Sequence, residues 1–190
     1  MKRSGIISLV VFGVILVAVV AGYAVHLNQK SKGDVERAVE STAVQKVLQR
    51  DLERNYPPTA KEVVKYYADI TKCFYNEEYT EEEMEQMAVK IQGVYDEELI
   101  ANKTQEDYMT DLRSEIASMK KNKWTISSYV LSASVDVEEF TENGYSCARL
   151  YCTFNVKQST NGTVPSMEEF ILRKDENGHW KILGWELVED

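Results

Sequence analysis

An uninterrupted apolar segment near the N-terminus, Gly5 to Val25, constrains this chain more than any other feature of its sequence. The segment contains no ionisable residue, and Ser8 is its one clearly polar side chain. An α-helix of about 20 residues, rising about 1.5 Å per residue, matches a hydrocarbon core about 30 Å thick. Because a backbone inside lipid must satisfy its own hydrogen bonds, we expect residues 1–27 to form a membrane anchor with one transmembrane helix.

A cleaved secretory signal is the alternative interpretation of this segment. Lys2 and Arg3 would supply its basic start, and small residues around Gly22 and Ala24 would supply a cleavage site. The apolar run is, however, longer than the roughly 7–15 residues typical of the core of a signal peptide. The length therefore favours a retained anchor.

The basic residues that flank the apolar segment give little information on its orientation. Lys2 and Arg3 precede it, whereas Lys30, Lys32 and Arg37 follow it, so the positive-inside comparison is nearly tied. A short N-terminal tail followed by a long C-terminal region is typical of a signal anchor. We therefore expect a single-pass protein of the cell membrane with its C-terminal domain on the extracytoplasmic side.

The charge of the region beyond the anchor excludes one class of partner. The first 32 residues carry four basic and no acidic side chains, whereas residues 33–190 carry 18 basic and 31 acidic ones, a net charge of −13. Proteins that bind nucleic acid present clustered positive charge to the phosphates. The sequence therefore predicts no nucleic-acid partner.

The cysteines and histidines do not form a metal-binding pattern. Cys147 and Cys152 are five residues apart in an alternating stretch, which predicts that they face opposite sides of a sheet, with Cys152 inside and Cys147 outside. The three cysteines are best interpreted as free thiols, although a disulfide between Cys73 and Cys152 stays open. His26 and His179 have no His or Cys close in sequence, so we expect neither a metal nor a cofactor.

The region after the anchor divides at a pair of prolines. Residues 28–56 contain a polar spacer and then apolar residues at helical spacing, including Val44 and Leu52, which predicts an amphipathic stalk helix. Pro57 and Pro58 should end that helix. We therefore expect a separate domain over residues 57–190.

Three N-terminal capping patterns mark the helices of this domain. Thr59, Thr80 and Thr104 each precede an acidic residue by three positions, so that the hydroxyl and the carboxylate can bond the first free N–H groups of a helix. An apolar stripe follows each pattern. The sequence predicts three helices, with a short helical turn around Leu99 and Ile100 between the second and the third.

The periodicity changes from helical to alternating after Trp124. Residues 129–137 alternate as a long, half-buried strand, and Asn143-Gly144 predicts a tight hairpin turn. Further strands are expected at residues 147–156, 167–174 and 180–188, with a loop at 159–166. The expected fold is α+β, with three helices packed on a bent antiparallel sheet of about four strands.

This order of elements resembles the nuclear transport factor 2-like superfamily, which has a cystatin-like α+β fold. The resemblance rests on the capped helix after Y-P-P-T, the helices before the strands, and the closing strand Trp180-Lys-Ile-Leu-Gly-Trp185-Glu, and it covers roughly residues 57–190. It implies a bent sheet that wraps around helices to form a cone. With an anchor in front, the layout is also similar to bridging subunits of type IV secretion machines and to anchored bacterial domains of unknown function.

Enzymes of that superfamily, such as ketosteroid isomerases, place acids or histidines inside the cone. Here the strand faces expected to point inward, on residues 129–137 and 148–156, carry no carboxylate or imidazole. The Tyr129 hydroxyl is the polar group expected in the cavity, and helix carboxylates such as Asp69 stay open as alternatives. The sequence therefore predicts a non-enzymatic domain.

The outward face of the central hairpin is the candidate interaction surface. It should present Arg149, Tyr151 and Thr153 beside Ser132 and Ser134, and Arg and Tyr are enriched at the energetic centres of interfaces. We expect a docking or assembly module whose partner is an unknown protein or a second copy of the chain. The alternative is a small-ligand binder or enzyme that uses the apolar cavity of the cone.

Overall fold

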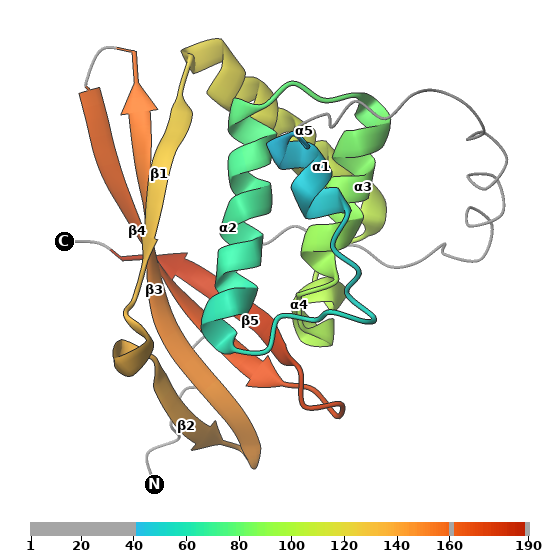
Figure 1. Cartoon of the computed structure of the whole chain (residues 1–190), viewed down its shortest axis with the longest axis vertical. Helices are drawn as coiled ribbons and strands as arrows, with labels where there is room; N and C mark the ends of the chain where they lie inside the picture. The colour runs from blue at the N-terminus through green and yellow to red at the C-terminus, as the bar shows by residue number, and fades with distance from the viewer. Residues whose placement is uncertain (1–40, 160–161, 189–190) are drawn as a thin grey trace, which may run out of the picture.

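The computed structural model describes residues 41–159 and 162–188 as two layers, one of helices and one of strands (Figure 1). The expected anchor at Gly5–Val25 lies outside the described residues. Within them, no helix has the length and apolar character needed to cross a bilayer. The expected α+β class, with helices preceding an antiparallel sheet, is confirmed.

The three capping patterns form helix N-termini as expected. Thr59 caps α2 (Ala60–Asn76), Thr80 caps α3 (Glu81–Gln92) and Thr104 caps α5 (Gln105–Asn122). At α3 the exchange is reciprocal, because the Thr80 hydroxyl accepts from the Glu83 N–H while the Glu83 carboxylate accepts from the Thr80 N–H. The short α4 (Glu97–Ala101) lies between α3 and α5, where a helical turn was expected.

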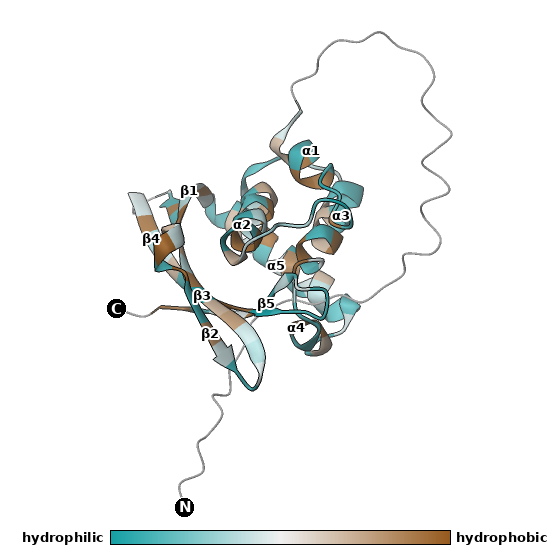
Figure 2. Cartoon of the chain, turned by 60° about the horizontal axis from the view of Figure 1, so that its bottom comes forward, coloured by the Kyte–Doolittle hydropathy of each residue, from teal (hydrophilic) through white to brown (hydrophobic). Residues whose placement is uncertain are grey.

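The strands form one antiparallel sheet of five strands in the order β1-β3-β4-β5, with β2 also paired to β3. The helices cover one face of this sheet, and the described residues leave the other face uncovered (Figure 2). Asn143 and Gly144 adopt φ angles of 51° and 85° in the β2–β3 turn, which confirms the predicted hairpin. The strands are β1 (Thr125–Leu131), β2 (Glu138–Glu142), β3 (Tyr145–Gln158), β4 (Gly162–Lys174) and β5 (Trp180–Leu187).

The prediction of one long strand over residues 129–137 is wrong, because the chain leaves the sheet after Leu131. A 3-10 turn at Ser134–Asp136 separates β1 from β2, and Val135 is 90% exposed. Leu131 pairs with Cys152 and Glu138 with Arg149, so the six residues between Leu131 and Glu138 correspond to only two residues of β3. The excursion divides the edge into two short strands that pair with the two halves of the longer β3.

The structure describes residues 41–56 of the expected stalk, and these residues pack against the domain. The helix α1 (Ala43–Leu48) buries Val44 and Val47 in the common core. The Tyr66 hydroxyl donates to the Val47 carbonyl at 2.9 Å, and the Tyr56 hydroxyl donates to the Trp180 carbonyl at 2.8 Å. The folded unit therefore includes residues on both sides of the two prolines.

Two further expectations about the sheet are corrected. β4 begins at Gly162 rather than near Met167, since residues 162–166 pair with the second half of β3 although Gly162 and Pro165 are typical of loops. Cys147, expected outside, is 3% exposed, because its cross-strand neighbours Phe140 and Arg173 flank it. Cys152 is buried as expected, and Cys73, Cys147 and Cys152 are all free thiols.

Candidate ligand-binding cavity

A cavity of about 230 Å³ lies between the helix layer and the inner face of the sheet. Side chains from α2, α3, the segment between α3 and α4, and α5 line its helical side, and side chains from β1, β3, β4 and β5 line its sheet side. Aromatic rings contribute from both layers of the fold. They are Tyr67, Phe74, Tyr75, Tyr95, Tyr108, Phe154 and Trp185.

The helical side of the wall follows from the spacing of residues on α2. Tyr67, Thr71, Phe74 and Tyr75 recur at intervals of three and four, so they share the face that the helix turns towards the sheet. The ring centroid of Tyr67 lies 5.1 Å from that of Trp185, a separation typical of favourable aromatic pairs. The two layers therefore meet through aromatic contacts at the cavity.

Trp185 reaches the cavity because β5 contains an irregularity opposite Ile171 and Leu172. Ile182 and Trp185 are three positions apart and would face opposite sides of a regular strand. The pairing of Ile182 with Leu172 and of Gly184 with Ile171 leaves Leu183 as the extra residue of a β-bulge. As a result, Ile182 is buried in the core and Trp185 still lines the cavity.

Glu168 is the carboxylate that β4 places in this wall. It alternates with the buried Phe170 and Leu172 along the strand and therefore faces the helices. Its Oε2 atom is buried and has no hydrogen-bond partner among the described residues. Burial, and then the negative charge of Glu115, raise the pKa of Glu168 from 4.5 to about 7.

Glu115 on α5 is the second carboxylate of the wall, at the more exposed side of the cavity. The Tyr75 hydroxyl donates to Glu115 Oε1 at 2.5 Å, which fixes the position of this carboxylate. Burial, and then the charge of Glu115, raise the pKa of Tyr75 well above its ordinary value, so the hydroxyl keeps its proton. The side chains that line the cavity within the described ranges include no Lys, Arg or His.

Tyr129, the expected polar residue of the cavity, is not among the residues that line it. Its hydroxyl instead donates to Asp69 Oδ1 on α2, and its ring lies 6.2 Å from that of Phe154. Asp69 also pairs with Lys65 at 2.8 Å. The bond between Tyr129 and Asp69 therefore joins β1 to α2 beside the cavity.

The candidate interaction surface is partly assembled as expected. Arg149, Tyr151 and Thr153 lie on the outer face of β3, and the Ser132 hydroxyl accepts from the Tyr151 N–H at 2.9 Å. Ser134 does not lie beside these residues, because it is in the exposed 3-10 turn between β1 and β2.

Acidic neighbours already engage the polar groups of this surface. Arg149 pairs with Glu138 and Glu169 at 3.2 Å each, and the Tyr151 hydroxyl donates to Glu169 at 2.6 Å. The local sequence pattern did not indicate these cross-strand partners, because Glu138 and Glu169 lie on other strands.

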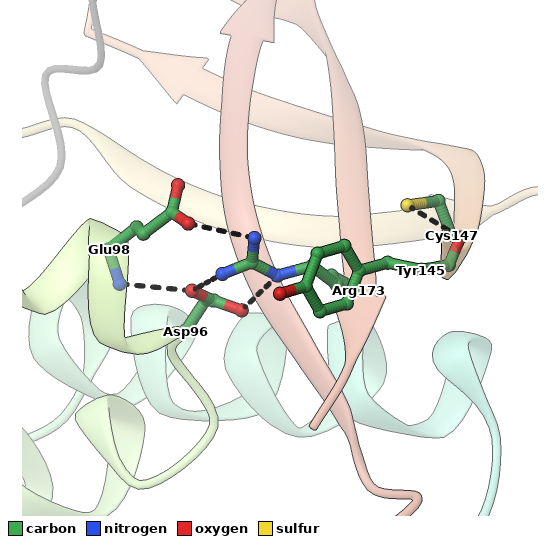
Figure 3. A network of polar contacts seen from close by, with 5 residues as sticks. All are labelled: Asp96, Glu98, Tyr145, Cys147 and Arg173. Carbon is green, nitrogen blue, oxygen red and sulfur yellow. Dashed lines mark hydrogen bonds and ion pairs between the residues drawn. The ribbon is translucent and has the colours of Figure 1, made fainter. Parts of the chain in front are cut away.

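A separate polar network attaches α4 to the sheet (Figure 3). Arg173 on β4 donates to both carboxylate oxygens of Asp96, at 2.6 and 3.0 Å, and to Glu98 at 2.8 Å. Asp96 is buried and also caps α4 by accepting from the Glu98 N–H. The guanidinium carbon also lies 4.8 Å from the Tyr145 ring centroid. Asp96, Glu98 and Arg173 are not among the residues that line the cavity, so this network has a structural role.

Neither carboxylate of the cavity, Glu115 or Glu168, was among the site residues predicted from the sequence. The available signal was the alternation of Glu168 with Phe170 and Leu172, which places an acid on a strand face that is otherwise apolar. Glu115 carries no such signal, because acidic residues are common on the exposed sides of helices. Within the described residues, no group of His, Cys, Asp and Glu side chains has an arrangement suited to a metal ion.

No curated protein matches this chain. The model of one family, described as a domain of unknown function (DUF6715), matches residues 1–185, which is almost the entire chain. The chain therefore belongs to the DUF6715 family.

Proposed function

We propose that this domain binds a small molecule in the cavity between α2, α5 and the sheet. The observation that carries the proposal is a cavity whose wall contains seven aromatic side chains and one partly desolvated carboxylate, Glu168. Binding sites typically combine an apolar enclosure with a few convergent polar groups. This arrangement favours the ligand-binding alternative over the docking module that the sequence first indicated.

The size of the cavity limits the ligand. At about 230 Å³ it is larger than an engineered cavity of about 150 Å³ that accepts benzene. It is smaller than the roughly 300–1,000 Å³ of pockets for drug-sized ligands. A compound with one ring and a short substituent fits this volume, whereas a nucleotide or a steroid does not.

The wider proposal places this binding module at a membrane. The apolar segment Gly5–Val25 supports a single span, and the helices and bent sheet support the cone-like architecture of the nuclear transport factor 2-like superfamily. The domain would face the extracytoplasmic side and sample small molecules there. In this proposal it is a binding protein rather than an enzyme.

A cavity-filling substitution tests the proposal. Ser166 lines the cavity from β4, and phenylalanine is favoured in strands, so Ser166→Phe should occupy the space that a ligand needs. We expect small one-ring compounds to shift the ¹⁹F resonance of Trp185 in the detergent-solubilised full chain carrying 5-fluorotryptophan. The shift should be lost in Ser166→Phe.

Met167→Phe is the matched control, since Met167 is the next residue and faces the opposite side of the sheet. It should bind the compounds as the wild type does. If no compound shifts Trp185 in the wild type, or if Ser166→Phe binds equally well, the cavity is not a binding site.

A second candidate function is self-association through the outer face of the sheet. Val130, Thr153 and Met167 are cross-strand neighbours, and Val130 and Met167 are exposed apolar side chains, as is the nearby Tyr151. An uncovered apolar strip of this kind supports pairing with a second copy of the chain.

Substitution of the two exposed apolar residues, Val130 and Met167, distinguishes self-association from ligand binding. Val130→Ser combined with Met167→Ser should shift the sedimentation profile of the full chain from dimer to monomer without changing its circular dichroism. A wild-type chain that sediments as a monomer at all concentrations would exclude this function for the outer face.

A further inference from the structure

We propose that the ligand of the cavity is a small organic cation, an ammonium group with one ring or a short apolar substituent. This inference rests on the proposed function and specifies its chemistry. The cation would lie among the rings of Tyr67, Tyr95 and Trp185 and would pair with Glu168 and Glu115.

The charge balance of the wall is the first argument. Two carboxylates, Glu115 and Glu168, share one cavity whose described lining contains no cationic side chain. The buried Glu168 Oε2 has no hydrogen-bond partner in the part of the chain that the structure describes, and buried carboxylates are normally paired or hydrogen-bonded. A cationic ligand would supply the missing partner and reduce the repulsion between the two acids. An anionic ligand would add a third negative charge.

The aromatic wall is the second, independent argument. Tyr67, Tyr95 and Trp185 form a contact cluster with ring centroids 5.1 to 6.3 Å apart. The faces of such rings carry negative electrostatic potential and attract cations, and aromatic cages are a common means of binding quaternary ammonium groups. An apolar ligand would use the rings but would leave the buried Glu168 Oε2 atom without a partner among the described residues.

The titratable groups around Glu168 set the pH dependence of binding. Those that face it come from α2, from the segment before α4, from α5 and from β3; they are Tyr67, Tyr75, Tyr95, Tyr108, Glu115 and Cys152. The tyrosines and the thiol stay protonated at neutral pH, since burial raises each of their pKa values. Glu168 is thus the group that titrates near pH 7, and cation affinity should rise with pH through that range.

The test compares two probes of nearly equal shape. Benzyltrimethylammonium and its neutral carbon isostere neopentylbenzene differ in one charged atom, and phenylacetate serves as the anionic probe. In the detergent-solubilised full chain at pH 8, the ¹⁹F shift of 5-fluorotryptophan at residue 185 should report at least about tenfold tighter binding of the cation than of the isostere. Phenylacetate should not compete.

Glu168→Gln should weaken cation binding about tenfold and leave the isostere unaffected, because it removes the charge and keeps the shape. The matched control is Glu169→Gln, which removes the same charge from the outer face of the same strand. Cation affinity should fall from pH 8 to pH 5.5 in the wild type and stay constant in Glu168→Gln.

Four results would overturn the inference. Equal affinity for the cation and the isostere, or preferred binding of phenylacetate, would leave a binding cavity with a different ligand class. An equal loss in Glu169→Gln would show a long-range charge effect only. Failure of every probe to shift Trp185 would reject both this inference and the proposed function.

Discussion

Glu168→Gln should make the domain more stable by as much as about 3 kcal/mol at pH 8 and leave its stability at pH 4 almost unchanged. The folded state raises the pKa of Glu168 from 4.5 to about 7, so the folded protein holds this proton more tightly than the unfolded chain does. A shift of this size corresponds to roughly 1.4 kcal/mol per pH unit over the interval between the two values.

The sign of this effect follows from proton binding. Between pH 4.5 and 7 the folded state binds more protons at Glu168 than the unfolded state, so stability falls as pH rises through this window. Below the window the carboxyl is protonated in both states. Glutamine resembles the protonated carboxyl and cannot ionise, so the variant should lack this slope.

Urea unfolding of the wild type and the variant at pH 4, 6 and 8 measures the effect. Glu169→Gln, on the outer face, should keep the slope of the wild type. Parallel pH profiles for the wild type and Glu168→Gln would contradict the placement of Glu168 in a desolvated wall.

Arg173→Leu should destabilise the domain by about 3–5 kcal/mol, the cost typical of removing one partner from a buried ion pair. The Arg173 side chain is 17% exposed and that of Asp96 only 6%, so the substitution leaves a buried carboxylate without its cation. The network also connects α4 to β4 (Figure 3), and its loss should loosen this attachment.

A double-mutant cycle separates the ion pair from the helix cap. Asp96→Asn keeps a side chain that can cap α4, so the coupling between Arg173→Leu and Asp96→Asn reports the pair itself. Urea unfolding should give a coupling of about 1–3 kcal/mol. The control Arg113→Leu removes a partner of the exposed Glu81 and should cost less than about 1 kcal/mol. Similar losses for Arg113→Leu and Arg173→Leu would contradict the buried status of the Arg173–Asp96 pair.

The features of the fold that the sequence predicted correctly are local ones. The N-terminal caps at Thr59, Thr80 and Thr104 and the turn at Asn143-Gly144 depend on residues within four positions of each other. Their hydrogen bonds and φ angles are set by short-range geometry. For that reason the main helices and the hairpin could be placed without knowledge of the tertiary structure.

The errors concern features that depend on residues far apart in sequence. The break after Leu131 reflects the length and pairing of β3, and the burial of Cys147 reflects cover by Phe140 and Arg173 from two other strands. The packing of Val44 and Val47 depends on contacts of α1 with α2 and α3. Alternation and helical spacing indicate which face of an element is apolar but not what covers it.

The cavity shows the same limit. The alternation around Glu168 could be read from the sequence. That Glu168 shares a cavity with Glu115 on α5 could not, because the two residues are far apart in the sequence. The strands at residues 129–137 and 148–156 predicted an inner face without acids, whereas the acid of the sheet lies on β4. Tyr129 was also predicted to lie in the cavity, whereas the bond to Asp69 holds this residue at the β1–α2 contact.

Intermolecular NOEs between the N-methyl protons of benzyltrimethylammonium and the ring protons of Trp185 test the central claim most directly. Trp185 and Tyr67 line the cavity from opposite layers, so a cation bound there should give NOEs to both rings in the full chain. The cavity-filling variant Ser166→Phe should show neither of these NOEs. NOEs confined to Tyr151 on the outer face, or NOEs that persist in Ser166→Phe, would contradict the account.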